Sequence, residues 1–254
     1  MAEYPEFVKA MLTPSFYPHA VGKVDLLQTQ MSFVFLAGDY VYKVKKPVDL
    51  GYLDYTTLEQ RRFFCEQELE LNRRLAPDIY LEVVPITAKE GSFTLRGEGV
   101  VVDYAVRMRR LPAEKMMNVL LASGQVTVEM VGRLAEKLVR FHDKAETGPK
   151  ISAFGSVEAI SFNCQENFSQ TTRYRGVSIE SADYDRIRLF TENFIATKRG
   201  LFEERIRRGR IRDCHGDLHA AHICFTDGIQ IYDCIEFNDR FRYCDVASEV
   251  AFLA

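Results

Sequence analysis

Strand-like patterns fill the first half of this 254-residue chain, and helical periodicity fills most of the second half. Before residue 110, runs rich in β-branched and aromatic residues are separated by turns, as in VDLL, SFVFLA and YVYKVKK around Gly38-Asp39. One helical pattern interrupts these runs and ends at Leu75, where Pro77 stops it. After Pro112, apolar residues recur at helical spacing. This order of elements predicts an α+β fold.

The change of pattern near residues 108–112 predicts two lobes. Residues 1–110 form the strand-rich lobe with one helix, and residues 111–254 form a mostly helical lobe with a short hairpin around Asp227-Gly228. Ligands commonly bind in clefts between lobes, so we expect the functional site there. The chain ends inside the apolar run VASEVAFLA, which predicts a truncated helical lobe and a further segment or domain in the full-length protein.

Charge and composition exclude several classes of partner. The chain has 33 Lys and Arg against 36 Asp and Glu, a net charge of −3, which gives no pull toward nucleic acid or an anionic membrane. No apolar stretch reaches the roughly 18 to 20 residues that cross a bilayer, and the N-terminus lacks a basic-then-apolar signal pattern. We therefore expect a cytoplasmic protein that binds neither nucleic acid nor membrane.

The groups that can carry chemistry gather in two segments, CHGDLHAAHI at residues 214–223 and IYDCIEFND at residues 231–239. The first holds three of the five histidines, and the second holds several carboxylates. Because the segments flank the predicted hairpin, their side chains could converge on one cation. Carboxylate oxygens suit Mg²⁺ or Mn²⁺, whereas the imidazoles of the same set suit Zn²⁺.

The segment HGDLHAAHI resembles the catalytic loop of a bacterial branch of the aminoglycoside phosphotransferase-like family, in the protein-kinase-like superfamily. That loop reads H-G-D, four residues, then Asn, and IEF resembles the I-D-F whose acid holds the metal. VYKVKKP resembles the strand with the nucleotide-binding lysine, CEQELELNRRL the helix whose glutamate pairs with it, and LVRFH the helix before the catalytic loop. The resemblance spans roughly residues 24–251. It implies a two-lobed protein-kinase-like fold, with an antiparallel sheet plus one helix in the N-lobe and a mostly helical C-lobe.

The resemblance also implies a function. The protein would move the γ-phosphoryl group of ATP or GTP to a hydroxyl of a small molecule, with Mg²⁺ or Mn²⁺ as the cation. Asp217 would accept or orient the proton of the acceptor hydroxyl, because phosphoryl transfer mainly needs positioning and charge neutralisation. Glu236 would hold the metal, although Glu stands there in place of the family's Asp.

Two further residues are candidate metal ligands. His222 occupies the place of the family's Asn, and an imidazole there could ligate a softer ion such as Mn²⁺, bond a phosphate or mark lost activity. Asp233 is a second acidic candidate, with a surface turn as the alternative. On a plain strand Asp233 and Glu236 would point to opposite faces, so both can face one ion only where the backbone turns between them.

Lys43 and Lys45 share one face of the predicted strand, and either could reach the nucleotide phosphates. We favour Lys43 as the nucleotide-binding lysine, because the residues on either side of it, Tyr42 and Val44, are typical of buried strand positions. For Lys45, the alternative is a position on a solvated strand edge. Glu68 has the spacing of the family's helix and would orient the lysine. The loop at residues 28–32, ending in Ser32, would lie over the phosphates.

Two other functions stay open. A nucleotide-binding regulator without turnover is motivated by His222 in the Asn position and by the incomplete helical lobe. A metal-dependent hydrolase is the third hypothesis, in which His215, Asp217, His219 and His222 bind zinc.

Overall fold

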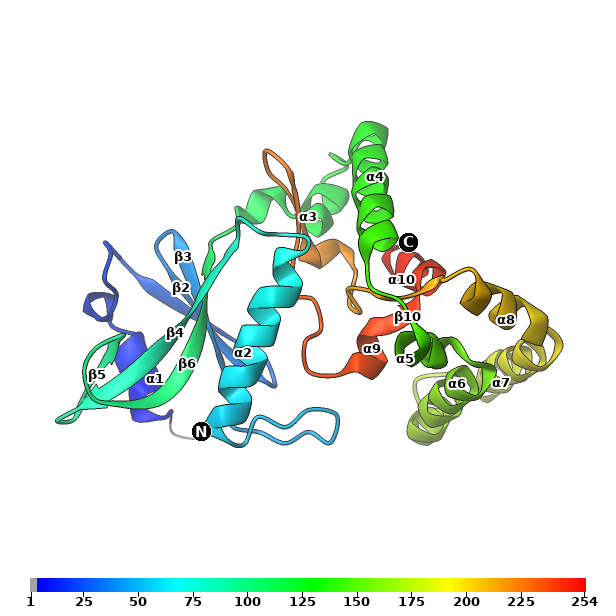
Figure 1. The fold of residues 1–254 in the computed structure, drawn as a ribbon, viewed down its shortest axis with the longest axis horizontal. Helices are drawn as coiled ribbons and strands as arrows, with labels where there is room; N and C mark the ends of the chain where they lie inside the picture. The colour runs from blue at the N-terminus through cyan, green and yellow to red at the C-terminus, as the bar shows by residue number, and fades with distance from the viewer. Residues whose placement is uncertain (1–3) are drawn as a thin grey trace. The chain divides into compact units, whose positions relative to one another are not determined.

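The computed structural model of the chain describes residues 4–254 and shows a mixed α/β structure (Figure 1). The described residues form two compact units. Unit 1 contains the chain up to Phe141 together with Asp217–Asn238, and unit 2 contains His142–Gly216 and Asp239–Ala254. The lobes inferred from the sequence, 1–110 and 111–254, are a separate, functional division and stay a prediction.

Unit 1 is built on a six-stranded antiparallel sheet with strand order β1-β2-β3-β6-β4-β5. Its strands are β1 Val24–Gln28, β2 Ser32–Ala37, β3 Tyr40–Lys45, β4 Tyr80–Lys89, β5 Ser92–Leu95 and β6 Val100–Arg109. β2 and β3 are joined at Gly38-Asp39, and Gly38 has a φ of 61°, which glycine adopts without steric cost. The antiparallel sheet expected from the first half of the sequence is confirmed.

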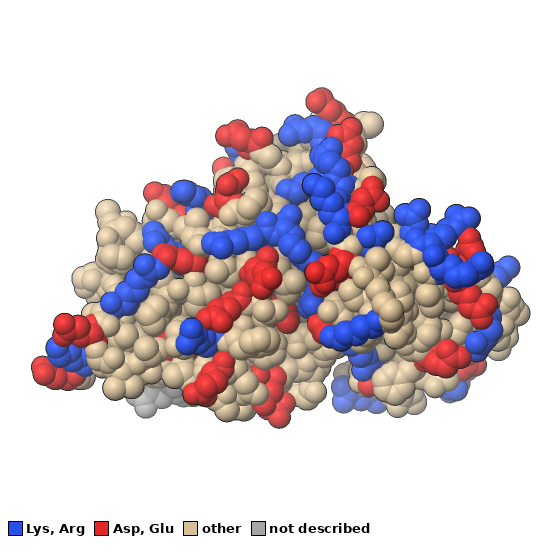
Figure 2. All heavy atoms as spheres, in the orientation of Figure 1, with Lys and Arg blue, Asp and Glu red and all other residues tan. Residues whose placement is uncertain are grey.

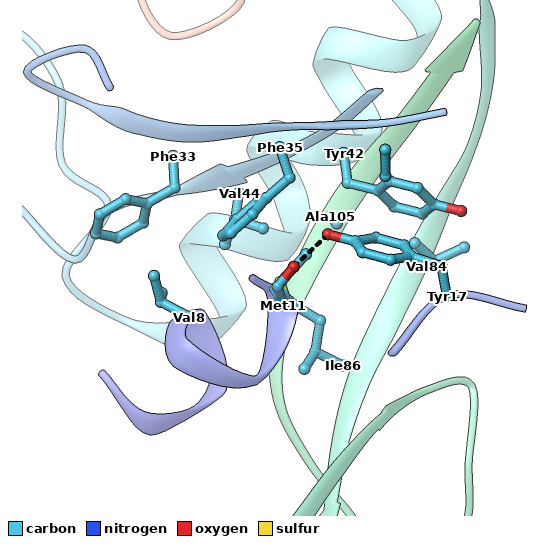
Figure 3. Close-up of a cluster of buried hydrophobic side chains, with 11 residues drawn as sticks. Val8, Met11, Tyr17, Phe33, Phe35, Tyr42, Val44, Val84, Ile86 and Ala105 are labelled. Atoms are coloured by element: carbon cyan, nitrogen blue, oxygen red, sulfur yellow. Dashed lines mark hydrogen bonds between the residues drawn. The ribbon is translucent and has the colours of Figure 1, made fainter. Parts of the chain in front are cut away.

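One face of this sheet packs against the N-terminal helix α1, Glu6–Met11 (Figure 3). Val8 and Met11 of α1 are fully buried among the side chains that β2 and β3 direct to this face. The hydroxyl of Tyr17 donates a hydrogen bond to the carbonyl oxygen of Met11, 2.7 Å away. Tyr42 and Val44 belong to this apolar cluster, so the alternate residues of β3 point to the opposite face.

The opposite face packs against helix α2, Leu58–Arg73. The helix begins with a capping box, in which Thr57 accepts from the amide of Gln60 and the Gln60 side chain accepts from the Thr57 amide. The inward face of α2 carries Cys65, Glu68 and Asn72, all almost fully buried. Buried polar groups need partners, and the partners of Glu68 and Asn72 make up the candidate site described below.

The remaining elements of unit 1 include α3 Met117–Ala122, the first part of α4 Val128–Lys144, and the hairpin of β8 Ile223–Phe225 and β9 Ile229–Ile231. The hairpin expected around Asp227-Gly228 is confirmed. Short 3-10 helices in the described chain are Pro14–Phe16, Ala113–Lys115, Ala153–Gly155, Thr172–Tyr174 and Ala220–His222.

Unit 2 is mostly helical. Its elements after α4 are α5 Pro149–Ser152, α6 Val157–Thr171, α7 Ser181–Thr197, α8 Arg199–Arg207, β7 Ile211–Asp213, α9 Asp239–Arg242, β10 Tyr243–Asp245 and α10 Val246–Leu253. Helix α6, in which the side chain of Ser156 accepts from the amide of Ala159, was not expected from the sequence. The same holds for the three-residue strands β7 and β10, which pair with each other. Such short strands lack enough residues for a period of two to be recognised.

The surface carries mixed charge. Figure 2 shows basic and acidic side chains interspersed over the visible face, in keeping with the net charge of −3. Across residues 4–254, none of the helices combines the length and the apolar character that crossing a membrane requires.

Candidate functional site

Two lysines of β3 meet one glutamate of α2 in unit 1. The Nζ atom of Lys43 lies 2.9 Å from Oε1 of Glu68 and 2.6 Å from Oδ1 of Asp233. The Nζ atom of Lys45 lies 2.8 Å from the other oxygen of Glu68 and also donates to Glu236. These five residues, which lie far apart in the sequence, form one cluster of ion pairs that we call the lysine cluster.

Both lysines and Glu68 stay ionised although they are buried. Burial opposes the charged form of Lys43, but the carboxylates of Asp233 and Glu68 outweigh it and raise the pKa of Lys43 well above its ordinary value. Burial likewise opposes ionised Glu68, but Lys43 and Lys45 lower the pKa of that carboxyl. Each charge therefore depends on the others, since removing one partner from a buried ion pair leaves an uncompensated charge.

Lys45 is the innermost lysine, with a side chain only 1% exposed. The solvated edge considered for Lys45 is therefore wrong, because the second glutamate partner and a tyrosine enclose it. Tyr55, from the irregular segment between β3 and α2, donates its hydroxyl to Oε1 of Glu236 over 2.6 Å, and its ring lies 4.8 Å from the Lys45 ammonium. No sequence signal pointed to Tyr55, because it belongs to no periodic element.

Asp233 is presented by a turn in the backbone. Its φ of 63° is unusual for a residue other than glycine. The Asp233 amide donates to the hydroxyl oxygen of Tyr80 at 3.1 Å, and the next amide, of Cys234, donates to Oδ1 of Asn72 at 2.9 Å. The backbone thus turns between Asp233 and Glu236, which is the condition for both acids to reach one side. The two differ in exposure, since the Asp233 side chain is 39% exposed and that of Glu236 only 5%.

A cavity of about 480 Å³ adjoins the lysine cluster within unit 1. Its apolar lining comes largely from the α2-facing side of the sheet and includes Leu27, Val34, Leu36, Val41, Ile79 and Met108. Its polar lining includes Lys43, Asp217, Asp233 and Glu236. A mainly apolar cavity of this size with a few convergent charged groups is typical of a small-molecule site.

Ser32 is not among the residues that line this cavity. It is the first residue of β2, pairs with Lys45 across the strands and is fully buried. Thr29 and Met31 of the same loop do line the cavity. The loop therefore contacts the cavity through Thr29 and Met31 and not through Ser32, the residue expected from the sequence. Ser32 already belongs to strand β2.

The rings of His219 and His222 lie against each other with their centroids 3.9 Å apart and their planes tilted by 37°, but the two side chains form different hydrogen bonds. Nδ1 of His222 lies 3.0 Å from the carbonyl oxygen of Asp217, which can only accept, so this nitrogen carries a hydrogen. Nε2 lies 3.6 Å from Oδ2 of Asp233. Nδ1 of His219 accepts the amide hydrogen of Ala221 at 3.2 Å, so its hydrogen lies on Nε2. Burial and the neighbouring His222 lower the pKa of His219 and favour its neutral form.

Unit 2 contains a second buried cluster, whose members no sequence pattern links. Nε2 of His142 lies 2.6 Å from Oε2 of Glu249, and Oε1 of Glu249 accepts from the amides of His215 and Gly216. Cys214 lies close enough to offer a third ligand atom. A hydrogen bond to Cys244 and burial raise the pKa of the Cys214 thiol strongly, so it stays protonated. A protonated thiol and a carboxylate already engaged by two amides favour a structural network.

Glu249 should make the stability of unit 2 depend on pH. Burial opposes its charge, but the bonds from His142 and Gly216 lower its pKa below the ordinary 4.5. The unfolded chain therefore takes up the proton first, so the ionised form stabilises the fold above that value and this contribution is lost as pH falls further. Glu249→Gln should reduce the free energy of unfolding by about 1 kcal/mol at pH 7.

Urea unfolding at several pH values checks this prediction. The difference between the wild type and Glu249→Gln should shrink as the pH falls below 4.5. Glu203→Gln, at an exposed position of the same unit, is the control and should match the wild type throughout. A difference that does not change with pH would contradict the assignment.

Comparison with known proteins places the chain beside uncharacterised relatives. No family model matches it. Uncharacterised proteins of Mycobacterium tuberculosis and Mycobacterium bovis are 34% identical to it over 232 residues, which cover 91% of this chain and 45% of each relative. The chain thus spans about half the length of the curated relatives it matches.

Proposed function

We propose that this protein is a phosphotransferase with a two-lobed, protein-kinase-like fold. It binds ATP or GTP with a divalent cation in the 480 Å³ cavity and passes the γ-phosphoryl group to a hydroxyl of a small molecule. The observation that most supports the proposal is the ion-paired set of Lys43, Glu68 and Asp233 at the polar part of an apolar cavity. A strand lysine paired with a helix glutamate beside a metal-binding aspartate is the arrangement that kinase-type phosphoryl transfer uses.

The cavity provides for both parts of a nucleotide. The apolar side chains of the sheet, such as Val34 and Met108, offer a surface for the flat base. Lys43 offers a point charge to the phosphates, and Glu68 holds the Lys43 ammonium in place. Lys45 does not line the cavity, so we assign the nucleotide to Lys43 and a supporting role to Lys45.

Among the acids, Asp233 is better placed than Glu236 to hold the cation. Its carboxylate is the more exposed of the two and lies near Nε2 of His222. Glu236 is nearly enclosed by Lys45 and Tyr55, which would have to release it before it could bind metal. Carboxylate and imidazole donors are a suitable set for a divalent ion. When bound, the ion would neutralise charge on the phosphates.

Asp217 is the proposed base. Its carboxylate is 37% exposed and lines the same cavity. In the proposed reaction the acceptor oxygen forms a bond to the γ-phosphorus while the bond from that phosphorus to the β–γ bridging oxygen breaks. The hydroxyl proton passes to Asp217, and the nucleoside diphosphate leaves with the bridging oxygen. Nε2 of His219 lies 3.8 Å from Oδ2 of Asp217, which is too long for a hydrogen bond, so we assign His219 no direct role in the reaction.

Calorimetric titration with ATP, with and without Mg²⁺ or Mn²⁺, tests this proposal. We expect metal-dependent binding that Asp233→Asn weakens by about tenfold or more, because the variant loses a charged ligand. Glu236→Gln is the matched variant and should bind ATP nearly as well as the wild type while melting at a lower temperature. Absence of ATP binding to the folded wild type would overturn the proposal, and equal losses in the two variants would overturn the choice of Asp233.

A further inference from the structure

We propose that helix α7 of unit 2 is an interface between two copies of this chain, which pair with their α7 helices antiparallel. The proposal concerns the association of the protein and involves none of the residues assigned to the phosphotransferase site. It is carried by an exposed apolar face of α7 and by the opposite charges at the two ends of that face.

Helix α7, Ser181–Thr197, has more apolar surface than unit 2 covers. Tyr184 is buried against α6, where its hydroxyl donates to the carbonyl oxygen of Phe168 over 2.5 Å. Ile187, Phe190 and Phe194 recur three and four positions apart, so they share one face of the helix. These three residues are 47%, 69% and 38% exposed. The face that we call the α7 stripe is therefore apolar and open to solvent.

The aromatic rings of the α7 stripe are already ordered. The ring of Phe194 lies 6.0 Å from that of Phe190, with the planes 28° apart. On its other side it meets the ring of Phe202, from α8, edge to face at 6.2 Å. A side chain that is held before association loses little conformational freedom when a partner binds it. The stripe is thus prepared for contact at a low entropic cost.

The area of the α7 stripe fits a weak, reversible dimer. An aromatic side chain buries about 150 to 250 Å² when it is covered, so the stripe leaves roughly 300 Å² of mostly apolar surface in water. Monomeric proteins rarely expose much larger apolar patches without a function for them. Two stripes together supply about half of the 1,200 Å² at which specific interfaces begin, and the flanking polar residues would supply the rest.

The charges at the ends of the stripe favour a second copy over other partners. Asp183 lies in the first turn of α7 and Lys198 at its C-terminal cap, both exposed. They stand seven and eight positions from Phe190. In an antiparallel pair centred on Phe190, each Asp183 therefore lies near Lys198 of the other copy. Because the pair has two-fold symmetry, this contact forms twice.

A parallel pair lacks this complementarity. It would place Asp183 beside Asp183 and Lys198 beside Lys198, and it would align the two helix dipoles, whereas antiparallel helices bring opposite ends together. Within one copy Asp183 also pairs with Arg186 at 3.0 Å. That ion pair is exposed and contributes little, so it does not keep Asp183 from a second copy.

Sedimentation velocity of the purified chain over a wide range of concentrations tests the proposal. We expect a monomer–dimer equilibrium with a dissociation constant on the order of tens of micromolar. Phe190→Glu should weaken it by at least about tenfold, because two carboxylates then meet in the centre of the interface. Leu189→Glu is the matched control. Leu189 is 59% exposed on a different face of the same helix, so this variant should dimerise like the wild type.

Charge reversal tests the antiparallel orientation. At low salt Asp183→Lys should weaken the dimer by about fivefold, and adding Lys198→Asp to it should restore the wild-type affinity, because each reversed charge meets the other. A chain that stays monomeric at every concentration overturns the proposal. So does a dimer that Leu189→Glu weakens as much as Phe190→Glu. If the double variant is no stronger than Asp183→Lys, the antiparallel pairing is wrong.

Discussion

Glu68→Met should lower the thermal unfolding midpoint by roughly 6 to 12 °C, which corresponds to about 3 kcal/mol in a unit of this size. Glu68 is fully buried and contacts both Lys43 and Lys45. Without it the two ammonium groups lie close together, and each keeps one carboxylate, Asp233 for Lys43 and Glu236 for Lys45. Circular dichroism during heating measures the shift.

Two further variants make this result specific. Glu70→Met, on the exposed side of α2, should leave the midpoint nearly unchanged, because surface substitutions usually change stability by less than about 0.5 kcal/mol. Adding Lys45→Met to Glu68→Met should recover part of the loss, since an apolar pair of similar volume removes one unpaired charge. If Glu68→Met unfolded at the same temperature as Glu70→Met, the lysine cluster would have no stabilising role.

Asp217→Asn should lower kcat by about 10²- to 10⁴-fold, the usual contribution of a positioned acid–base group. The amide cannot accept the hydroxyl proton, but it has nearly the shape of the carboxylate. The dissociation constant for ATP should therefore stay unchanged, because Lys43 and Asp233 carry that interaction in our proposal. The measurement is release of nucleoside diphosphate with an acceptor found by screening hydroxyl compounds.

Asp227→Asn is the control for this loss. Asp227 lies exposed in the turn of the β8–β9 hairpin, so its substitution should leave turnover at the wild-type rate. If Asp217→Asn turned over as fast as the wild type, Asp217 would not be the base of the reaction. ATP binding by the wild type, with no turnover for any acceptor, would favour the regulator without turnover that the sequence left open.

Several parts of the candidate site could be predicted because their signal is local. The alternation of β3 puts Lys43 and Lys45 on one face whatever the sheet packs against. Asn72 follows Glu68 by four positions, so both lie on one face of α2, and this signal could have identified Asn72 as a buried partner. No such signal pointed to Glu249. The backbone amides that donate to its carboxylate belong to His215 and Gly216, which lie far from it in the sequence.

The sequence by itself determined the order of elements, the antiparallel sheet with its helix and the clustering of acids and histidines in two segments. These features depend on periodicity and turn residues, which act between near neighbours. The tertiary structure alone decided that Lys45 is buried, that Ser32 is withdrawn from the cavity and that Asp233 is more accessible than Glu236. Burial and ion pairing arise between residues as far apart as Lys43 and Asp233, and local propensity does not encode the distance between such side chains.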